Sequence, residues 1–195
     1  MKGLIVAATA YLIGSFSSAY FVGKLFMKID IRSHGSGNAG ATNAVRVMGS
    51  KLGVITFLLD FLKGIIAVLL GLLLYKELGG YIAAFFVVIG HNWPVFLNFK
   101  GGKGIATTIA AMAVLEFPVA LISVITGITI AIITKYVSVG SITFLVTLFV
   151  LTASGLFITN PYLNLLTGLL AILGLYRHRQ NIARLKAGTE NKIGR

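Results

Sequence analysis

The residues best suited to chemistry lie in a polar segment near the amino terminus, DIRSHGSGNAGATNAVR at residues 30–46. Its three glycines, Gly35, Gly37 and Gly40, alternate with serine, asparagine and threonine. Glycine accepts positive φ angles and close backbone approach, so successive N–H groups can converge on an anion while the polar side chains add donors. We interpret the segment as a phosphate-binding nest. A flexible polar loop is the alternative, and a P-loop is excluded because GxxxxGK[ST] is absent.

A second polar segment, GHNWPVFLNFKGGKGIATT at residues 90–108, carries Lys100 and Lys103 to the start of an apolar run. A helix amino terminus holds about half a positive charge, and Lys103 between two glycines could add a full charge beside free amide groups. We interpret Lys103 as an anion-binding residue, with topological anchoring as the alternative, and Lys100 as a membrane anchor, with anion binding as the alternative. His91 could pair with this site or act as a capping or interfacial histidine.

The third polar segment, RHRQNIARLKAGTENKIGR at residues 177–195, is basic and partly amphipathic. Taken alone, it fits a helix lying on anionic lipid. His178 is nevertheless well placed to titrate near neutral pH, and Asn181 follows one helical turn later on the same face. Ser138 and Ser141 have the same spacing, so one helical turn would present both hydroxyls to a single pocket.

Asp60 and Lys63 are three residues apart inside an apolar run. Either charge alone would cost a few kcal/mol at the centre of a bilayer. We therefore expect a structural ion pair, and a proton or ion path for transport is the alternative.

Long apolar runs separate these segments. The chain of 195 residues is 57% hydrophobic and 11% charged, and its mean hydropathy of +0.93 indicates an integral membrane protein. We predict an all-α polytopic bundle of about seven transmembrane helices, of which the fourth is short or partly re-entrant. The predicted spans are about 4–27, 52–75, 80–97, 104–116, 118–134, 137–158 and 162–176.

Charge decides the expected orientation and the classes of partner. Most of the 17 lysines and arginines fall on one side of the predicted bundle. This side is cytoplasmic by the positive-inside rule, so the amino terminus is external and the carboxy terminus cytoplasmic. The net charge of +12 suits anionic lipid and phosphorylated substrates. Nucleic acid is excluded as a partner because the basic residues lie in short segments between apolar runs. The absence of cysteine excludes disulfides and thiolate chemistry.

Three motifs, GSGNAGATN, GHNWPVFLNFKGGKG and RHRQNIARLKAGTENK, together resemble the signature regions of bacterial acyl-phosphate:glycerol-3-phosphate acyltransferases, the PlsY family. They occur in the family's order and cover nearly the whole chain. One departure is that the family often carries a proline near Ser17. The resemblance implies one integral membrane acyltransferase domain over residues 1–195, in the bacterial inner (cytoplasmic) membrane, with its active site on the cytoplasmic face.

The resemblance also implies a reaction, in which a fatty acyl group passes from acyl phosphate to the 1-hydroxyl of glycerol 3-phosphate, giving lysophosphatidic acid and phosphate for phospholipid biosynthesis. An acyl phosphate has a good leaving group, so direct attack without a covalent enzyme intermediate is expected. The implied catalytic residues are His178, Lys103 and Ser141, with His178 or a substrate phosphate oxygen as the proton acceptor. The implied substrate-binding residues are Ser36, Gly37, Asn38, Gly40, Thr42, Asn43, Arg46, Gly102, Asn181, Lys186 and Glu190.

Other classes fit less well. No histidine has aspartate five positions later, so the HxxxxD acyltransferase pattern is absent, and two aspartates are too few for the metal site of a CDP-alcohol phosphotransferase. We expect no metal, no cofactor and a monomer. A transporter or flippase for phosphorylated anions is the second hypothesis, although the chain has no apparent internal repeat and its polar residues gather on one face. A purely structural scaffold leaves the glycine and lysine motifs unexplained.

Overall fold

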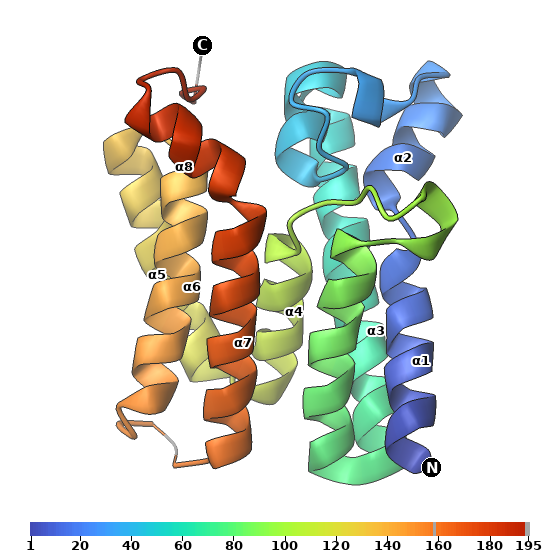
Figure 1. Ribbon diagram of the computed structural model, residues 1–195, viewed down its shortest axis with the longest axis vertical. Coiled ribbons are helices and arrows are strands. Elements are labelled where there is room, and N and C mark those ends of the chain that lie inside the picture. The colour runs from blue at the N-terminus through green and yellow to red at the C-terminus, as the bar shows by residue number, and fades with distance from the viewer. Residues whose placement is uncertain (158, 194–195) are drawn as a thin grey trace. The chain divides into compact units, whose positions relative to one another are not determined.

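The computed structural model describes residues 1–157 and 159–193, most of which are helical, with no strand among them (Figure 1). The chain divides into two compact units, Met1–Leu115 and Glu116–Arg195. Apolar helices make up most of both units, so the predicted all-α membrane fold is confirmed. The orientation of the termini stays a prediction.

The first unit is built on a long helical element that doubles back. Element α3 (Ala41–Asn92) follows α1 (Lys2–Ser15), α2 (Ser18–Val22), the π-helical turn η1 (Gly23–Met27) and the 3-10 turn η2 (Ile31–Ser33). Non-helical angles at Gly49 and at Tyr75 and Lys76 divide α3 into a short first segment and two long arms. The arms contact each other through the backbones of Gly71 and Gly79, and both α1 and α4 (Ile105–Leu115) pack against α3.

The second unit contains α5 (Phe117–Thr134), α6 (Val137–Ala153), α7 (Pro161–Arg177) and the short α8 (Arg179–Lys186). A left-handed Lys135 turns the chain between α5 and α6, and the two helices approach closely where Gly127 meets Gly140. Small residues of this kind are the usual contact between membrane helices, because lipid offers no hydrophobic drive for association. Thr152 and Thr167 share a 2.7 Å hydrogen bond between α6 and α7.

The predicted spans correspond to these helices. Three stretches are long and apolar enough to cross a bilayer by length and composition, and the one that contains α3 holds two arms. The three stretches therefore contain four membrane-length helices. Together with α4, α6 and α7 they make seven among the described residues, as predicted. The first rod is broken at Phe16 and Ser17, and the sixth ends at Ala153, before the predicted limit, because Gly155 takes a φ of 71° in a turn. The end of that predicted span, residue 158, and residues 194–195 of the third polar segment lie outside the described residues.

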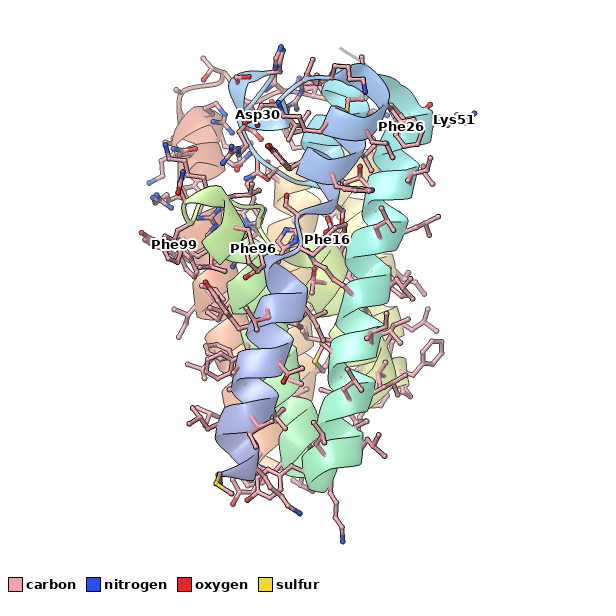
Figure 2. All side chains as sticks on the ribbon, turned by 90° about the vertical axis from the view of Figure 1, so that its right-hand side faces the viewer. Phe16, Phe26, Asp30, Lys51, Phe96 and Phe99 are labelled. Atoms are coloured by element: carbon pink, nitrogen blue, oxygen red, sulfur yellow. The ribbon has the colours of Figure 1, made fainter. Side chains whose placement is uncertain are left out.

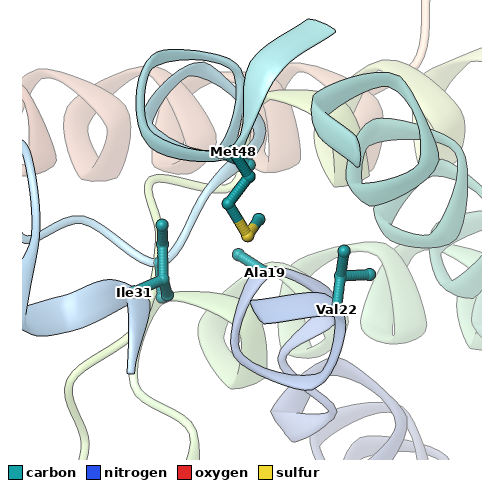
Figure 3. Close-up of a cluster of buried hydrophobic side chains, with 6 residues drawn as sticks. Ala19, Val22, Ile31 and Met48 are labelled. Carbon is teal, nitrogen blue, oxygen red and sulfur yellow. The ribbon is translucent and has the colours of Figure 1, made fainter. Parts of the chain in front are cut away.

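A small buried cluster fixes the glycine segment to the first unit (Figure 3). Ala19 and Val22 of α2, Ile31 of η2 and Met48 of α3 pack together there. Ile31 is fully buried, so its truncation to alanine would cost about 2–5 kcal/mol by lost burial and cavity formation. The segment between η1 and α3 is therefore held in place by packing and is not a free linker.

Candidate functional site

The glycine segment adopts the backbone that its sequence predicts. Gly35 and Gly37 have φ angles of 59° and 71°, and the Gly37 amide donates to the His34 carbonyl over 3.1 Å. Gly40 instead is extended and precedes the first turn of α3. Amides in this first turn lack intrahelical partners, so a turn rich in glycine leads directly into a helix amino terminus, an arrangement suited to an anion.

Asn43 holds this segment in shape. Its Oδ1 accepts a 2.9 Å hydrogen bond from the Ser36 amide, and its Nδ2 donates to the carbonyls of His34 and Ile31 at 3.0 and 3.3 Å. The side chain is buried, so these contacts replace water. A direct bond from Asn43 to a substrate would require the release of one of them. Its predicted binding role stays a prediction, while its role in shaping the segment is a structural finding.

The other predicted binding residues of this segment surround the same turn. Ser36, Gly37, Thr42 and Arg46 are exposed, whereas Asn38 is half-buried beside Gly40. The structure therefore leaves these groups at the surface of the first unit, where a ligand could reach them.

An ion pair that sequence reasoning did not single out joins the two polar segments of the first unit. Arg32 binds both carboxylate oxygens of Asp30, with its Nη2 2.7 Å from Oδ2, and its Nη1 donates to the Leu97 carbonyl over 2.9 Å. The Arg32 hydrogen bonds hold the pKa of Asp30 below its usual value. Only the spacing DxR hinted at this pair, and nothing in the sequence indicated Leu97 as its partner.

Gly102 lies directly against the glycine segment. Its amide donates to the His91 carbonyl over 3.0 Å. A Cβ added to Gly102 would lie 2.8 Å from His91 Cε1, nearer still to Nε2, and 3.0 Å from the Ala39 carbonyl oxygen, so only glycine fits. The structure thus brings the neighbouring Lys103, which is half-buried, to the same end of the first unit as the predicted nest.

The predicted ion pair inside the membrane span is confirmed. Lys63 Nζ lies 2.8 Å from Asp60 Oδ1, and both side chains are almost completely buried. His91, considered above as a partner of the second segment, also contacts this pair, with Nδ1 2.9 Å from Lys63 Nζ. An ion pair with these contacts accounts for the two charges without a transport path.

In the second unit, His178 is buried at the junction of α7 and α8. Its Nδ1 lies 2.8 Å from the Gly174 carbonyl oxygen. A carbonyl only accepts, so Nδ1 carries the proton, and in the neutral ring Nε2 is the nitrogen that can accept one. This tautomer matches the predicted role of His178 as a base.

Glu190 is the centre of the second group of polar residues. It accepts hydrogen bonds from Ser138 Oγ at 2.9 Å, from Arg184 Nε at 2.7 Å and from Asn181 Nδ2. Burial alone would raise the pKa of Glu190, but these three bonds outweigh it and hold the pKa below its usual value. Glu190 thereby orients Asn181 on α8, and Arg184 is its cation. Sequence reasoning missed Arg184, for which the charge spacing of six residues was the only signal.

Two predicted residues of the second unit are placed differently from this group. Ser141 donates to the Val137 carbonyl of its own helix at 2.9 Å, so Ser138 and Ser141 do not share one partner. Lys186 is exposed at the end of α8. The catalytic role of Ser141 and the binding role of Lys186 stay predictions.

The apolar helices of the two units define an integral membrane protein. The sequence model of the family described as glycerol-3-phosphate acyltransferase matches residues 4–188, and the chain belongs to this family. A glycerol-3-phosphate acyltransferase of Thermoanaerobacter pseudethanolicus is 48% identical over 194 residues, covering 100% of this chain and 97% of the relative. One from Halalkalibacterium halodurans is 45% identical, covering 99% and 96%.

Solved structures show the same likeness. The crystal structure of PlsY (YgiH), an integral membrane glycerol 3-phosphate acyltransferase, in its glycerol 3-phosphate form matches with a TM-score of 0.89 and 36% identity, over 100% of this chain and 96% of that one. Its lysophosphatidic acid form matches with a TM-score of 0.86 and 35% identity, over the same shares of both chains. The resemblance drawn from the three motifs is confirmed.

Proposed function

We propose that this acyltransferase uses acyl phosphate as its donor and acylates the 1-hydroxyl of glycerol 3-phosphate, giving lysophosphatidic acid and inorganic phosphate. The observation that carries the proposal is the contact of Gly102 with Ala39, which puts the Lys103 segment beside the glycine nest. Both reactants bear phosphate, so the reaction needs backbone donors and cations together. The related PlsY crystallised in a glycerol 3-phosphate form and in a lysophosphatidic acid form, which supports this acceptor and this product.

The proposed roles follow the chemistry of each group. Ser36, Asn38 and Thr42 supply donors to phosphate, together with the amides of the glycine segment, and Arg46 adds a charge. Lys103 stabilises negative charge that develops on the carbonyl oxygen during attack. These roles require no covalent intermediate, because the phosphate of a mixed anhydride leaves readily.

In the proposed step the acceptor hydroxyl oxygen attacks the acyl carbonyl carbon, and the bond from this carbon to the phosphate oxygen breaks. The hydroxyl proton passes to His178 Nε2 or to an oxygen of the departing phosphate. The His178 tautomer supports the first route, because Nδ1 is already committed to the Gly174 carbonyl. Asn181 lies three residues after His178 and donates to Glu190, and we assign it to binding of the acceptor.

We further propose that the enzyme is a monomer in the bacterial inner membrane and that its polar groups face the cytoplasm. The positive-inside distribution of lysine and arginine supports this orientation. A long-chain acyl phosphate partitions into the bilayer while glycerol 3-phosphate stays in water, so a site at the cytoplasmic surface meets both reactants.

Product formation by the purified, reconstituted protein tests the donor. Glycerol 3-phosphate is supplied with acyl phosphate, acyl-CoA or an acyl carrier protein thioester in separate reactions. Lysophosphatidic acid and free phosphate from acyl phosphate alone are expected. Activity with a thioester would overturn the donor assignment but keep acyl transfer, and no product with any donor would overturn the function.

A second measurement tests the base. His178→Ala should lower kcat, because the proton acceptor is lost, while KM for glycerol 3-phosphate changes less. An unchanged kcat with a raised KM would make His178 a binding residue and assign the proton to the phosphate.

A further inference from the structure

The first membrane-spanning rod contains a break that no proline explains. Phe16 has ψ of 115° and Ser17 has φ of −95° and ψ of 100°, so α1 stops and α2 starts again within two residues. Figure 2 shows Phe16 at this break. Each backbone polar group left unpaired in an apolar span costs several kcal/mol, so a break here needs partners.

The buried ion pair contacts both sides of the break and supplies the partner of the Phe16 carbonyl. Lys63 Nζ donates to the Phe16 carbonyl over 2.7 Å, and Ser18 Oγ donates to Asp60 Oδ1 over 2.8 Å. The cation thus lies at the carboxyl end of α1 and the anion beside the first residue of α2. These are the signs that the dipoles of the two helices favour at those ends.

His91 is the third partner of the Lys63 ammonium. The Lys63 ammonium has three donors, and Asp60, the Phe16 carbonyl and His91 Nδ1 lie within 2.9 Å of it. Nδ1 also lies 3.4 Å from Asp60 Oδ1, so this nitrogen is held at the ion pair and Nε2 is the ring atom nearest to Gly102. The ion pair fixes the orientation of the histidine ring.

The same ring sets the position of the Lys103 segment. Gly102 lies between the His91 ring and the carbonyl of Ala39, the residue between Asn38 and Gly40 of the nest. Its amide is bound to the His91 carbonyl. A continuous set of contacts thus runs from the ion pair through His91 and Gly102 to the glycine segment.

We propose that Asp60, Lys63 and His91 are positioning residues that hold the Gly101–Lys103 segment against the nest and thereby aim Lys103 at the reacting groups. They do not act as catalytic residues, because all three side chains are buried. This inference rests on the proposed function of Lys103. It assigns a role in turnover to a charge pair in the membrane span.

The test uses His91→Asn, which keeps a polar group near Nδ1 for Lys63 but removes the ring atoms that touch Gly102. A displacement of about 1 Å in a positioning group can cost a hundredfold in rate, so kcat with acyl phosphate should fall about 10- to 100-fold. Thr152→Val is the control, because it also removes a buried hydrogen bond, in this case between α6 and α7. It should lower the melting temperature without a comparable loss of kcat.

A double-mutant cycle separates positioning from general destabilisation. If His91 acts through Lys103, His91→Asn lowers kcat/KM less than about threefold when Lys103→Ala is already present. Losses that multiply would overturn the inference. Wild-type protein that makes no product would refute the proposed function itself, which is a distinguishable result.

A spin label provides a readout that needs no turnover. The protein has no native cysteine, so Lys100→Cys, at an exposed position of the same segment, gives a single labelling site. Its spectrum should show faster motion in His91→Asn than in the otherwise unchanged protein or in Thr152→Val. Identical spectra in all three proteins would overturn the proposal even if the double mutant were inactive.

Discussion

Replacement of Asn43 by alanine should loosen the glycine segment while the helices stay folded. The side chain makes three hydrogen bonds to backbone groups of residues 31–36 and is 2% exposed. Each such bond contributes about 0.5–1.5 kcal/mol net, so their loss should favour opening of the segment by about 2–4 kcal/mol. This corresponds to a shift of about 30- to 1000-fold in the local opening equilibrium, since about 1.4 kcal/mol is a factor of ten.

Hydrogen exchange followed by mass spectrometry on peptides that cover residues 30–43 measures this shift. The Ser36 amide is the reporter, because Asn43 Oδ1 is its acceptor. The matched control is Asn38→Ala, the same change in the same segment at a side chain that makes no hydrogen bond within the described part of the chain. Asn38→Ala should leave the exchange rate of Ser36 near that of the wild type.

Equal exchange in Asn43→Ala and in the wild type would refute the assignment of Asn43 as the residue that shapes the segment. Its effect on substrate affinity would then have to come from direct contact. Faster exchange together with a raised KM for glycerol 3-phosphate would fit a nest that is populated only part of the time.

Four further results are expected. Lys103→Ala should lower kcat/KM by about 100- to 1000-fold in the acyl phosphate assay, as for the loss of an oxyanion donor, whereas Lys100→Ala should change it less than about threefold. Lys63→Met leaves Asp60 buried without its cation and should lower the unfolding free energy by about 3–5 kcal/mol. Adding Asp60→Asn to this variant should recover part of the lost stability, and thermal unfolding in detergent measures both variants. Because the folded-state pKa of Glu190 is below its usual value, its contribution to stability is present above about pH 4.5 and is lost as pH falls through the folded pKa. The melting temperature should therefore fall in acid, and Glu190→Gln should flatten this dependence. Chelation with EDTA should leave turnover unchanged, and a loss that magnesium restores would contradict the expectation of a metal-free reaction.

The spans and the backbone of the glycine segment could be predicted because they depend on local sequence. Apolar runs of membrane length gave the helices, and glycine spacing gave the positive φ at Gly35 and Gly37. The break at Phe16 was not predicted from the residues, since GSFSSAYF reads as a continuous apolar run without proline. The Phe16 carbonyl at this break is bound by Lys63, which lies 47 residues further along the chain. Hydropathy carries no information about such a partner.

Long-range partners also explain what was missed at the site. Asparagine and serine in a glycine-rich segment indicate hydrogen bonding, but not whether the partner is a substrate or the chain itself. Asn43 binds its own segment, and Ser138 reaches Glu190 across 52 residues. Arg32 donates to the carbonyl of Leu97, which lies 65 residues further along the chain. Each of these choices is made by tertiary packing, which residue type and spacing do not specify.

The brevity of α4 has a consequence for the membrane around the enzyme. Its 11 residues rise about 16 Å, roughly half the hydrocarbon thickness of a bilayer, and it begins two residues after Lys103. Every residue of α4 is buried or half-buried, so protein and not lipid borders this short helix, and water can follow the Lys103 segment to the depth at which the helix begins. A donor whose tail stays in the bilayer then needs to raise its head group only part of the way to the aqueous phase.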